Sequence, residues 1–172
     1  MTCKTKSRQK GTKKAPKNMM SPIAKGIDMS QFTPQQQKEI ELGLKKKKKK
    51  RNPIDVSVYV DPKFSVWQMR VIREGLEAGL DVSHYANPAF GVVEMCVIRE
   101  GLRKGLDVSV YAKPEYKFLQ MEEIRMGLEA GIDVSRYADP KLSWQEMRKI
   151  REEMLTPTEP EEIEEEEEEI VK

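Results

Sequence analysis

"IREGLEAGLDVSHYANPAF" spans residues 72–90, and the chain repeats it with few changes at 98–116 ("IREGLRKGLDVSVYAKPEY") and 124–142 ("IRMGLEAGIDVSRYADPKL"). Four residue types recur at this step of 26 residues over a longer range. They are Tyr59, Tyr85, Tyr111 and Tyr137; Pro62, Pro88, Pro114 and Pro140; Met69, Met95, Met121 and Met147; and Ile72, Ile98, Ile124 and Ile150. A period of this length is typical of stacked supersecondary units that bury their apolar faces against each other.

Each unit predicts one helix, which is clearest between Val66 and Ala78. The helix is expected to begin after Ser65, because Ser65 and Gln68 have the spacing of a capping box. Gly79 suits the left-handed position that ends a helix. The apolar residues at spacings of three, three and four lie on one helical face: Val66, Met69, Ile72 and Leu76.

The segment after each helix is expected to be compact. Asp81 can cap a second short turn near residues 82–86, which Pro88 ends. A unit is then one helix of about 13 residues plus a short helical or 3₁₀ turn. We therefore expect an all-α fold, a short right-handed α-solenoid of 26-residue units with disordered tails. Its expected parts are a basic head (1–27), a degenerate first repeat with a lysine insertion (28–55), a four-unit domain (56–155) and an acidic tail (156–172).

Arginines and glycines recur inside the predicted helices, where each needs an explanation. The arginine after each repeated isoleucine lies within the apolar sector, so its charged head needs a partner. We expect a structural ladder in which Arg73, Arg99 and Arg125 pair with Asp81, Asp107 and Asp133. The alternative is an exposed arginine row that meets phosphates. A mid-helix glycine costs roughly 1 kcal/mol, so close packing of a neighbouring connector is predicted at Gly75, Gly101 and Gly127.

Signals for catalysis are sparse, so we expect no catalytic, cofactor-binding or metal-binding residues. The single histidine, His84, and Cys96 occupy positions that vary between repeats, and there is no Walker loop, GxGxxG or CxxC. The methionine column is expected to be core rather than an adaptable binding groove. Two cysteines, Cys3 and Cys96, form no disulfide framework, which favours a reducing cytoplasm. We expect no membrane partner, because no apolar run approaches roughly 18 residues.

Charge is strongly segregated along the chain. Residues 1–52 carry 16 Lys/Arg and 3 Asp/Glu, a net charge of +13, whereas residues 156–172 carry 1 and 9, a net charge of −8. Basic runs bind phosphates through counterion release, but a solvated extension is the alternative. The candidate nucleic-acid-binding residues are Lys45, Lys46, Lys47, Lys48, Lys49, Lys50 and Arg51. The acidic tail could fold back on these lysines and compete with phosphates.

The frame "YADPKLSWQEMRKIREEML" (137–155), together with "GLEAGLDVSHYANP" (75–88), resembles a tandem helical repeat in proteins of Gram-positive gut bacteria and their mobile elements. The resemblance covers roughly residues 28–155. It implies a mobile-element or phage setting, and it transfers no catalytic or binding residue because the repeat carries no established activity. The lysine insertion and the degenerate first unit depart from its pattern.

The function expected from the sequence is a non-enzymatic interaction module that binds a protein partner and is itself a monomer. Specificity is expected from positions that vary between repeats: Arg70, Cys96, Glu122 and Arg148; Glu77, Arg103 and Glu129; and Val58, His84, Val110 and Arg136. The alternative is a nucleic-acid-associated accessory protein that binds phosphates, without sequence specificity, through its basic head.

Overall fold

The structure is a computed structural model that describes residues 26–47 and 54–156. Most of the predicted basic head and acidic tail therefore lies outside the described residues. Within the described ranges, five α-helices alternate with five 3₁₀ turns and no strand is present, which confirms the all-α prediction. The order is η2 (Met29–Gln31), α1 (Pro34–Lys47), η3 (Val56–Val58), α2 (Val66–Ala78), η4 (Val82–His84), α3 (Val92–Arg103), η5 (Val108–Val110), α4 (Phe118–Glu129), η6 (Val134–Arg136) and α5 (Trp144–Leu155).

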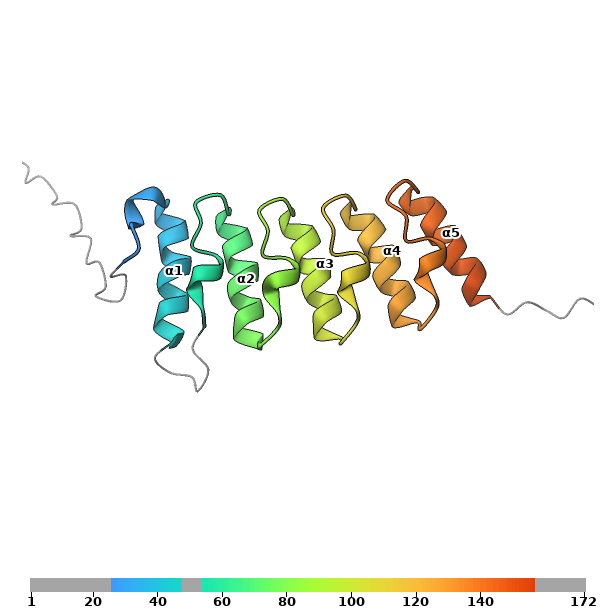
Figure 1. Ribbon diagram of the computed structural model, residues 1–172, viewed down its shortest axis with the longest axis horizontal. Helices are drawn as coiled ribbons and strands as arrows, with labels where there is room; N and C mark the ends of the chain where they lie inside the picture. The colour runs from blue at the N-terminus through green and yellow to red at the C-terminus, as the bar shows by residue number, and fades with distance from the viewer. Residues whose placement is uncertain (1–25, 48–53, 157–172) are drawn as a thin grey trace, which may run out of the picture.

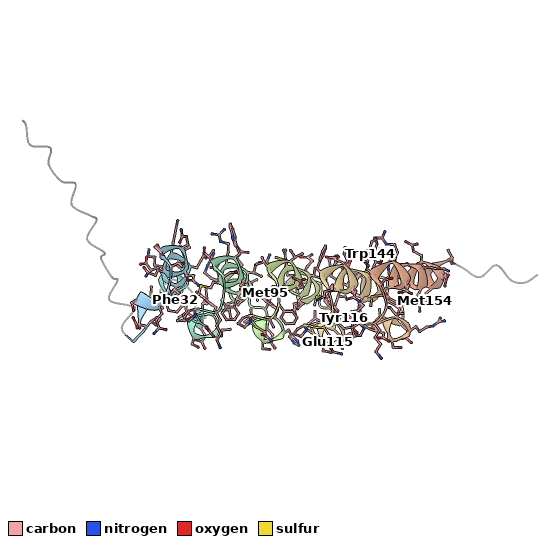
Figure 2. All side chains as sticks on the ribbon, turned by 90° about the horizontal axis from the view of Figure 1, so that it is seen from above. Phe32, Met95, Glu115, Tyr116, Trp144 and Met154 are labelled. Atoms are coloured by element: carbon pink, nitrogen blue, oxygen red, sulfur yellow. The ribbon has the colours of Figure 1, made fainter. Side chains whose placement is uncertain are left out.

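The five helices lie side by side in chain order, and each packs against the next (Figure 1). They run in the same direction, so their N-terminal ends share one edge of the row. The 3₁₀ turns and the segments around them form a second layer against one face of the helices (Figure 2). The opposite face of the helix layer is left open.

The predicted signals for the ends of α2 are confirmed. Ser65 and Gln68 form a capping box, and Gly79 ends the helix in the left-handed region at φ 76°. The turn that follows is also capped as predicted, because the Asp81 carboxylate accepts a hydrogen bond from the Ser83 amide at 3.0 Å. α3 begins differently, since its N-cap is Gly91 and no side chain caps it.

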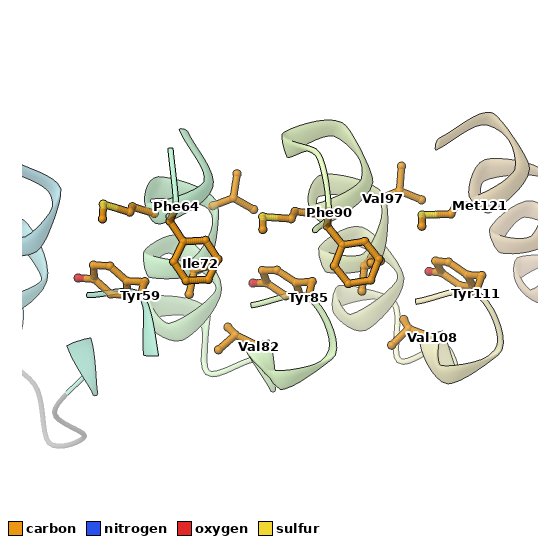
Figure 3. Close-up of a cluster of buried hydrophobic side chains, with 14 of the residues drawn as sticks. Tyr59, Phe64, Ile72, Val82, Tyr85, Phe90, Val97, Val108, Tyr111 and Met121 are labelled. Carbon is orange, nitrogen blue, oxygen red and sulfur yellow. The ribbon is translucent and has the colours of Figure 1, made fainter. Parts of the chain in front are cut away.

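A tyrosine–glycine contact joins each helix to the connector that follows it. A Cβ atom on Gly75 would lie 1.8 Å from the Tyr85 hydroxyl and 2.9 Å from Val82 Cγ1. The side chain of Tyr85 is completely buried, and the arrangement recurs along the row (Figure 3). The same contact pairs Gly43 with Tyr59, Gly101 with Tyr111 and Gly127 with Tyr137. The close packing predicted from the mid-helix glycines is therefore confirmed.

A buried glutamine reinforces three of these four joints. The Gln68 side chain accepts the Ser65 amide through Oε1, and its Nε2 donates to the Phe90 carbonyl at 2.7 Å. One amide therefore caps its own helix and holds the next connector. Gln36 and Gln120 make the equivalent bonds to Phe64 and Leu142. α3 carries Glu94 at this position, and an ionised carboxylate cannot donate such a bond.

Candidate interaction surface

Apolar side chains line the edge of the row where the helices begin. We call this set the apolar band: Val66, Trp67, Val92, Val93, Phe118, Leu119 and Trp144. Trp67 is 57% exposed, Val93 52% and Phe118 40%, and the other four are half-buried. Each of α2, α3 and α4 starts with two consecutive apolar residues. Because successive helical residues point about 100° apart, only one of the two can face the core.

Both tryptophans of the chain belong to the apolar band, and each is covered on one side by an arginine. The Arg70 guanidinium lies 4.8 Å from the centre of the Trp67 ring, and Arg148 lies at the same distance from Trp144. Trp and Arg are the residue types most enriched among the energetic centres of protein interfaces. The stacking fixes the two rings at opposite ends of the apolar band without hiding them.

A pocket of about 300 Å³ opens in the apolar band between α4 and α5. Phe118, Leu119 and Trp144 give it apolar walls together with Pro140, and Lys117 lies at its rim; the remaining lining residues are Glu115, Gln120 and Ser143. A concave, largely apolar surface with a few polar groups suits the insertion of one apolar side chain. The pocket therefore offers the apolar band an anchor site between α4 and α5.

Two buried glutamates hold the arginines that cover the apolar band. Glu39 on α1 accepts bonds from Arg70 at 2.9 Å and from Arg73 at 3.0 Å. Glu123 on α4 is bonded in the same way by two arginines of α5, Arg148 at 3.0 Å and Arg151 at 2.9 Å. Both carboxylates are only 2% exposed. These two carboxylates position the Trp–Arg pairs at both ends of the apolar band.

The predicted ladder between arginines and aspartates is wrong. The three arginines pair with glutamates on helices instead. Arg73 pairs with Glu39 and Glu77, Arg99 pairs with Glu74, and Arg125 pairs with Glu122 and Glu129. Asp81, Asp107 and Asp133 instead cap the 3₁₀ turns and are exposed to solvent. The short aspartate side chain is held by the serine amide two residues later, whereas the arginines extend along the helix layer. The rival prediction, a free arginine row for phosphates, does not fit paired side chains either.

The electrostatics of the joints follow from burial and from these contacts. Burial raises the pKa of Tyr137 to about 12. Burial opposes the charge on Arg73, but hydrogen bonds from its guanidinium to Glu39 and Glu77 raise its pKa overall. The pKa of Asp107 is lowered by hydrogen bonds from the Ser109 hydroxyl and amide. All these groups therefore keep their usual charge state near neutral pH.

Little of the predicted phosphate-binding run falls within the described residues. Lys45 is exposed and forms a weak surface pair with Glu41 at 3.4 Å. Lys46 and Lys47 continue α1, but their side chains lie outside the described part, as do residues 48–51. Phosphate binding by the run stays a prediction.

The residues expected to carry specificity are mostly engaged within the molecule. Arg70 and Arg148 hold the buried glutamates, Glu122 and Glu129 pair with Arg125, and Glu77 pairs with Arg73; Cys96 is half-buried. The apolar band was missed by the sequence analysis, although the paired apolar residues at the start of three helices were its signal. It holds three of the four large apolar side chains that are exposed among the described residues.

Comparisons with family models, curated proteins and solved structures found no match to this chain. Over residues 26–47 and 54–156, no group of three or more His, Cys, Asp or Glu side chains could hold a metal ion. None of the helices in the described part of the chain has the length and apolar content needed to cross a membrane.

Proposed function

We propose that this chain is a non-enzymatic helical-repeat module that binds a protein partner through the apolar band. The exposure of Trp67, Val93 and Phe118 along one edge carries the proposal. Contiguous exposed apolar surface on a folded domain is typical of a protein-binding site. The pocket beside Trp144 and the two Trp–Arg pairs supply anchors at known positions.

The proposal includes the architecture that presents the apolar band, a short right-handed solenoid of 26-residue units. Two observations support it: the 3₁₀ turns from η3 to η6 begin at residues 56, 82, 108 and 134, and each helix packs mainly on its neighbours. Such stacking repeats one surface position at each helix, which suits an extended partner.

Residues at equivalent positions of other helices indicate which substitutions can remove the apolar band without disturbing the fold. At the position of Trp67, Val93 and Leu119, α1 and α5 carry glutamine, Gln35 and Gln145. The triple variant Trp67→Gln, Val93→Gln, Leu119→Gln should therefore fold normally. Peptides selected from a display library on the full-length chain should lose binding to this variant.

The matched control places three glutamines on the opposite edge of the same helix layer, in Glu100→Gln, Arg103→Gln, Glu152→Gln. These residues belong to the C-terminal halves of their helices and make few ion pairs. Selected peptides should bind this control as they bind the wild type. A library that yields no binder, or binders indifferent to the triple variant, would rule out the proposed surface.

The second candidate is sequence-independent binding of nucleic acid by the basic N-terminal region. The observation that favours it is the run of seven cations at residues 45–51, at and beyond the end of α1. Fluorescence anisotropy with labelled DNA and RNA should then show affinity that falls about 10³-fold or more between 50 and 200 mM salt. Replacing residues 45–51 with glutamine should abolish it, whereas the apolar-band variant should leave it unchanged.

A further inference from the structure

We propose that the C-terminal segment of this chain, residues 157–172, lies across the apolar band and competes with outside partners. The inference rests on the function proposed above, because it names a regulator of the same surface. Among its sixteen residues the segment has three large aliphatic ones, Ile163, Ile170 and Val171. Ile163 enters the pocket beside Trp144, and Ile170 with Val171 reaches toward Trp67.

The reach of the segment fits this path. It starts after Thr156, at the end of α5, and α5 has 12 residues, which makes it about 18 Å long. Ile163 follows Thr156 by seven residues, so an extended chain places it up to about 23 Å away. That distance is enough to run back along α5 to the pocket of Phe118 and Trp144.

The extended distance from Ile163 to Ile170 matches the spacing of the helices. Ile170 follows Ile163 by seven residues, a further extended length of about 23 Å. Neighbouring packed helices lie about 8–10 Å apart, so this length crosses two to three helices from the pocket. It ends between Val93 on α3 and Trp67 on α2. A run of like charges favours the extended chain that this path needs.

Charge along the path is mixed and does not by itself select the occupant, because Arg70, Arg148 and Lys149 each lie beside a carboxylate. The segment carries nine glutamates and one lysine. Lys149 on α5 has a side chain that is 78% exposed, and Arg148 beside Trp144 is 46% exposed. Lys117 lies at the pocket rim and Arg70 at the far end of the apolar band. Glu94, Glu122 and Glu146 share this edge, so the aliphatic anchors, and not net charge, set the register of the segment.

The two tryptophans report directly on this contact, because they are the only ones in the chain and both lie in the apolar band. The test compares the full-length wild type with the full-length variant Ile163→Ser, Ile170→Ser, Val171→Ser by acrylamide quenching of tryptophan emission. A matched control, Met19→Ser, Met20→Ser, Ile23→Ser, removes three apolar residues from the N-terminal head. All six positions lie outside the described residues 26–47 and 54–156.

We expect the quenching constant of the tail variant to rise, because both indole rings would lose their contact with the segment. Its emission should also move to longer wavelength, and the head control should match the wild type. Equal quenching in wild type and tail variant would overturn the inference. So would a difference that appears only at high protein concentration, because a second copy would then be the occupant.

The outcome separates this inference from the proposed function. If quenching is the same in wild type and tail variant but selected peptides still need the apolar band, the tail contact is refuted and the proposed function is supported. If the tail variant is quenched more strongly but no peptide binds either form, the tail contact is supported and the proposed function is refuted. If both hold, the tail variant should bind selected peptides more tightly than the wild type does.

Discussion

The joint between Gly101 and Tyr111 allows the most quantitative test of how the row holds together. In an open helix, Gly→Ala stabilises by roughly 1 kcal/mol. Here the added Cβ would lie 2.0 Å from the Tyr111 hydroxyl and 2.9 Å from Val108 Cγ1, whereas carbon contacts are favourable only at about 3.5–4.0 Å. Overpacking of this kind costs about 1–3 kcal/mol and cancels the gain in propensity. We therefore expect Gly101→Ala to destabilise the chain by up to about 2 kcal/mol.

The tyrosine hydroxyl provides the second arm of the experiment. It is buried without a hydrogen-bond partner at Tyr111, so Tyr111→Phe should be neutral or slightly stabilising. With the hydroxyl gone, the nearest ring carbon would lie 3.3 Å from the new Cβ. The double variant should recover at least half of the loss, and its coupling energy should be about 1 kcal/mol or more.

The assay is urea unfolding of the full-length chain followed by far-ultraviolet circular dichroism, with each variant at several protein concentrations. The matched control is Tyr137→Phe, because the Tyr137 hydroxyl donates to the Glu123 carbonyl at 3.2 Å. That substitution should cost about 1 kcal/mol, unlike Tyr111→Phe. A stabilising Gly101→Ala, or a double variant that behaves as the sum of its parts, would refute the account of the joint.

Three further substitutions test the contacts around the joints. Glu94→Gln should stabilise by about 1 kcal/mol, because it supplies the missing amide donor to the next connector; an unchanged urea midpoint would count against the glutamine contact. Glu123→Val should destabilise by about 3 kcal/mol, because Arg151, whose side chain is only 12% exposed, loses its closest carboxylate; a loss below about 1 kcal/mol would contradict this estimate. The lowered pKa of Asp107 means that its cap stabilises the fold above the unfolded pKa and is lost as pH falls through the folded one. The wild type should therefore lose more unfolding free energy than Asp107→Asn between about pH 5 and about pH 3, and equal losses would exclude this role.

The features predicted well from the sequence are those that depend on residues close together in the chain. Ser65, Gly79 and Asp81 act locally, through hydrogen bonds or backbone conformation within a few residues. Gly101 was also informative, because a glycine retained in mid-helix implies a close neighbour. These signals need no knowledge of how the helices are arranged in space.

The arginine partners could not be found in the same way, because they do not recur. Glu39 and Glu123 stand where α2 and α3 have Val71 and Val97, so comparing repeats hides them. The ladder was assigned to aspartates because only the aspartates repeat. The usable signal was a correlation: each glutamate at this buried position precedes a helix with the pattern R-x-x-R, at 70–73 and at 148–151.

α4 shows how the repeated arginine is placed when the facing helix lacks a glutamate equivalent to Glu39 or Glu123. Arg125 occupies the position of Arg73 and Arg151, but the facing helix carries Val97, and no carboxylate, at the position of Glu39 and Glu123. Its Nε atom is buried without a hydrogen-bond partner, whereas the Nε atoms of the other two arginines bond to glutamate. The buried glutamates are therefore placed at the first and last pairs of helices, whereas the middle pairs are joined by more exposed ion pairs such as Arg99 with Glu74.

The same comparison distinguishes the two ends of the described row from its internal joints. Each internal joint needs a glycine on one helix and a tyrosine on the next connector. α5 carries Glu153 where the other helices have glycine, so a tyrosine cannot pack there. Before α1, the single residue Phe32 donates its amide to Met29, as Tyr59 does to Val56, and directly precedes the N-cap, as Phe64 does. Within the described residues, α5 therefore lacks the glycine and the segment before α1 lacks the tyrosine of the joint that connects the other helices.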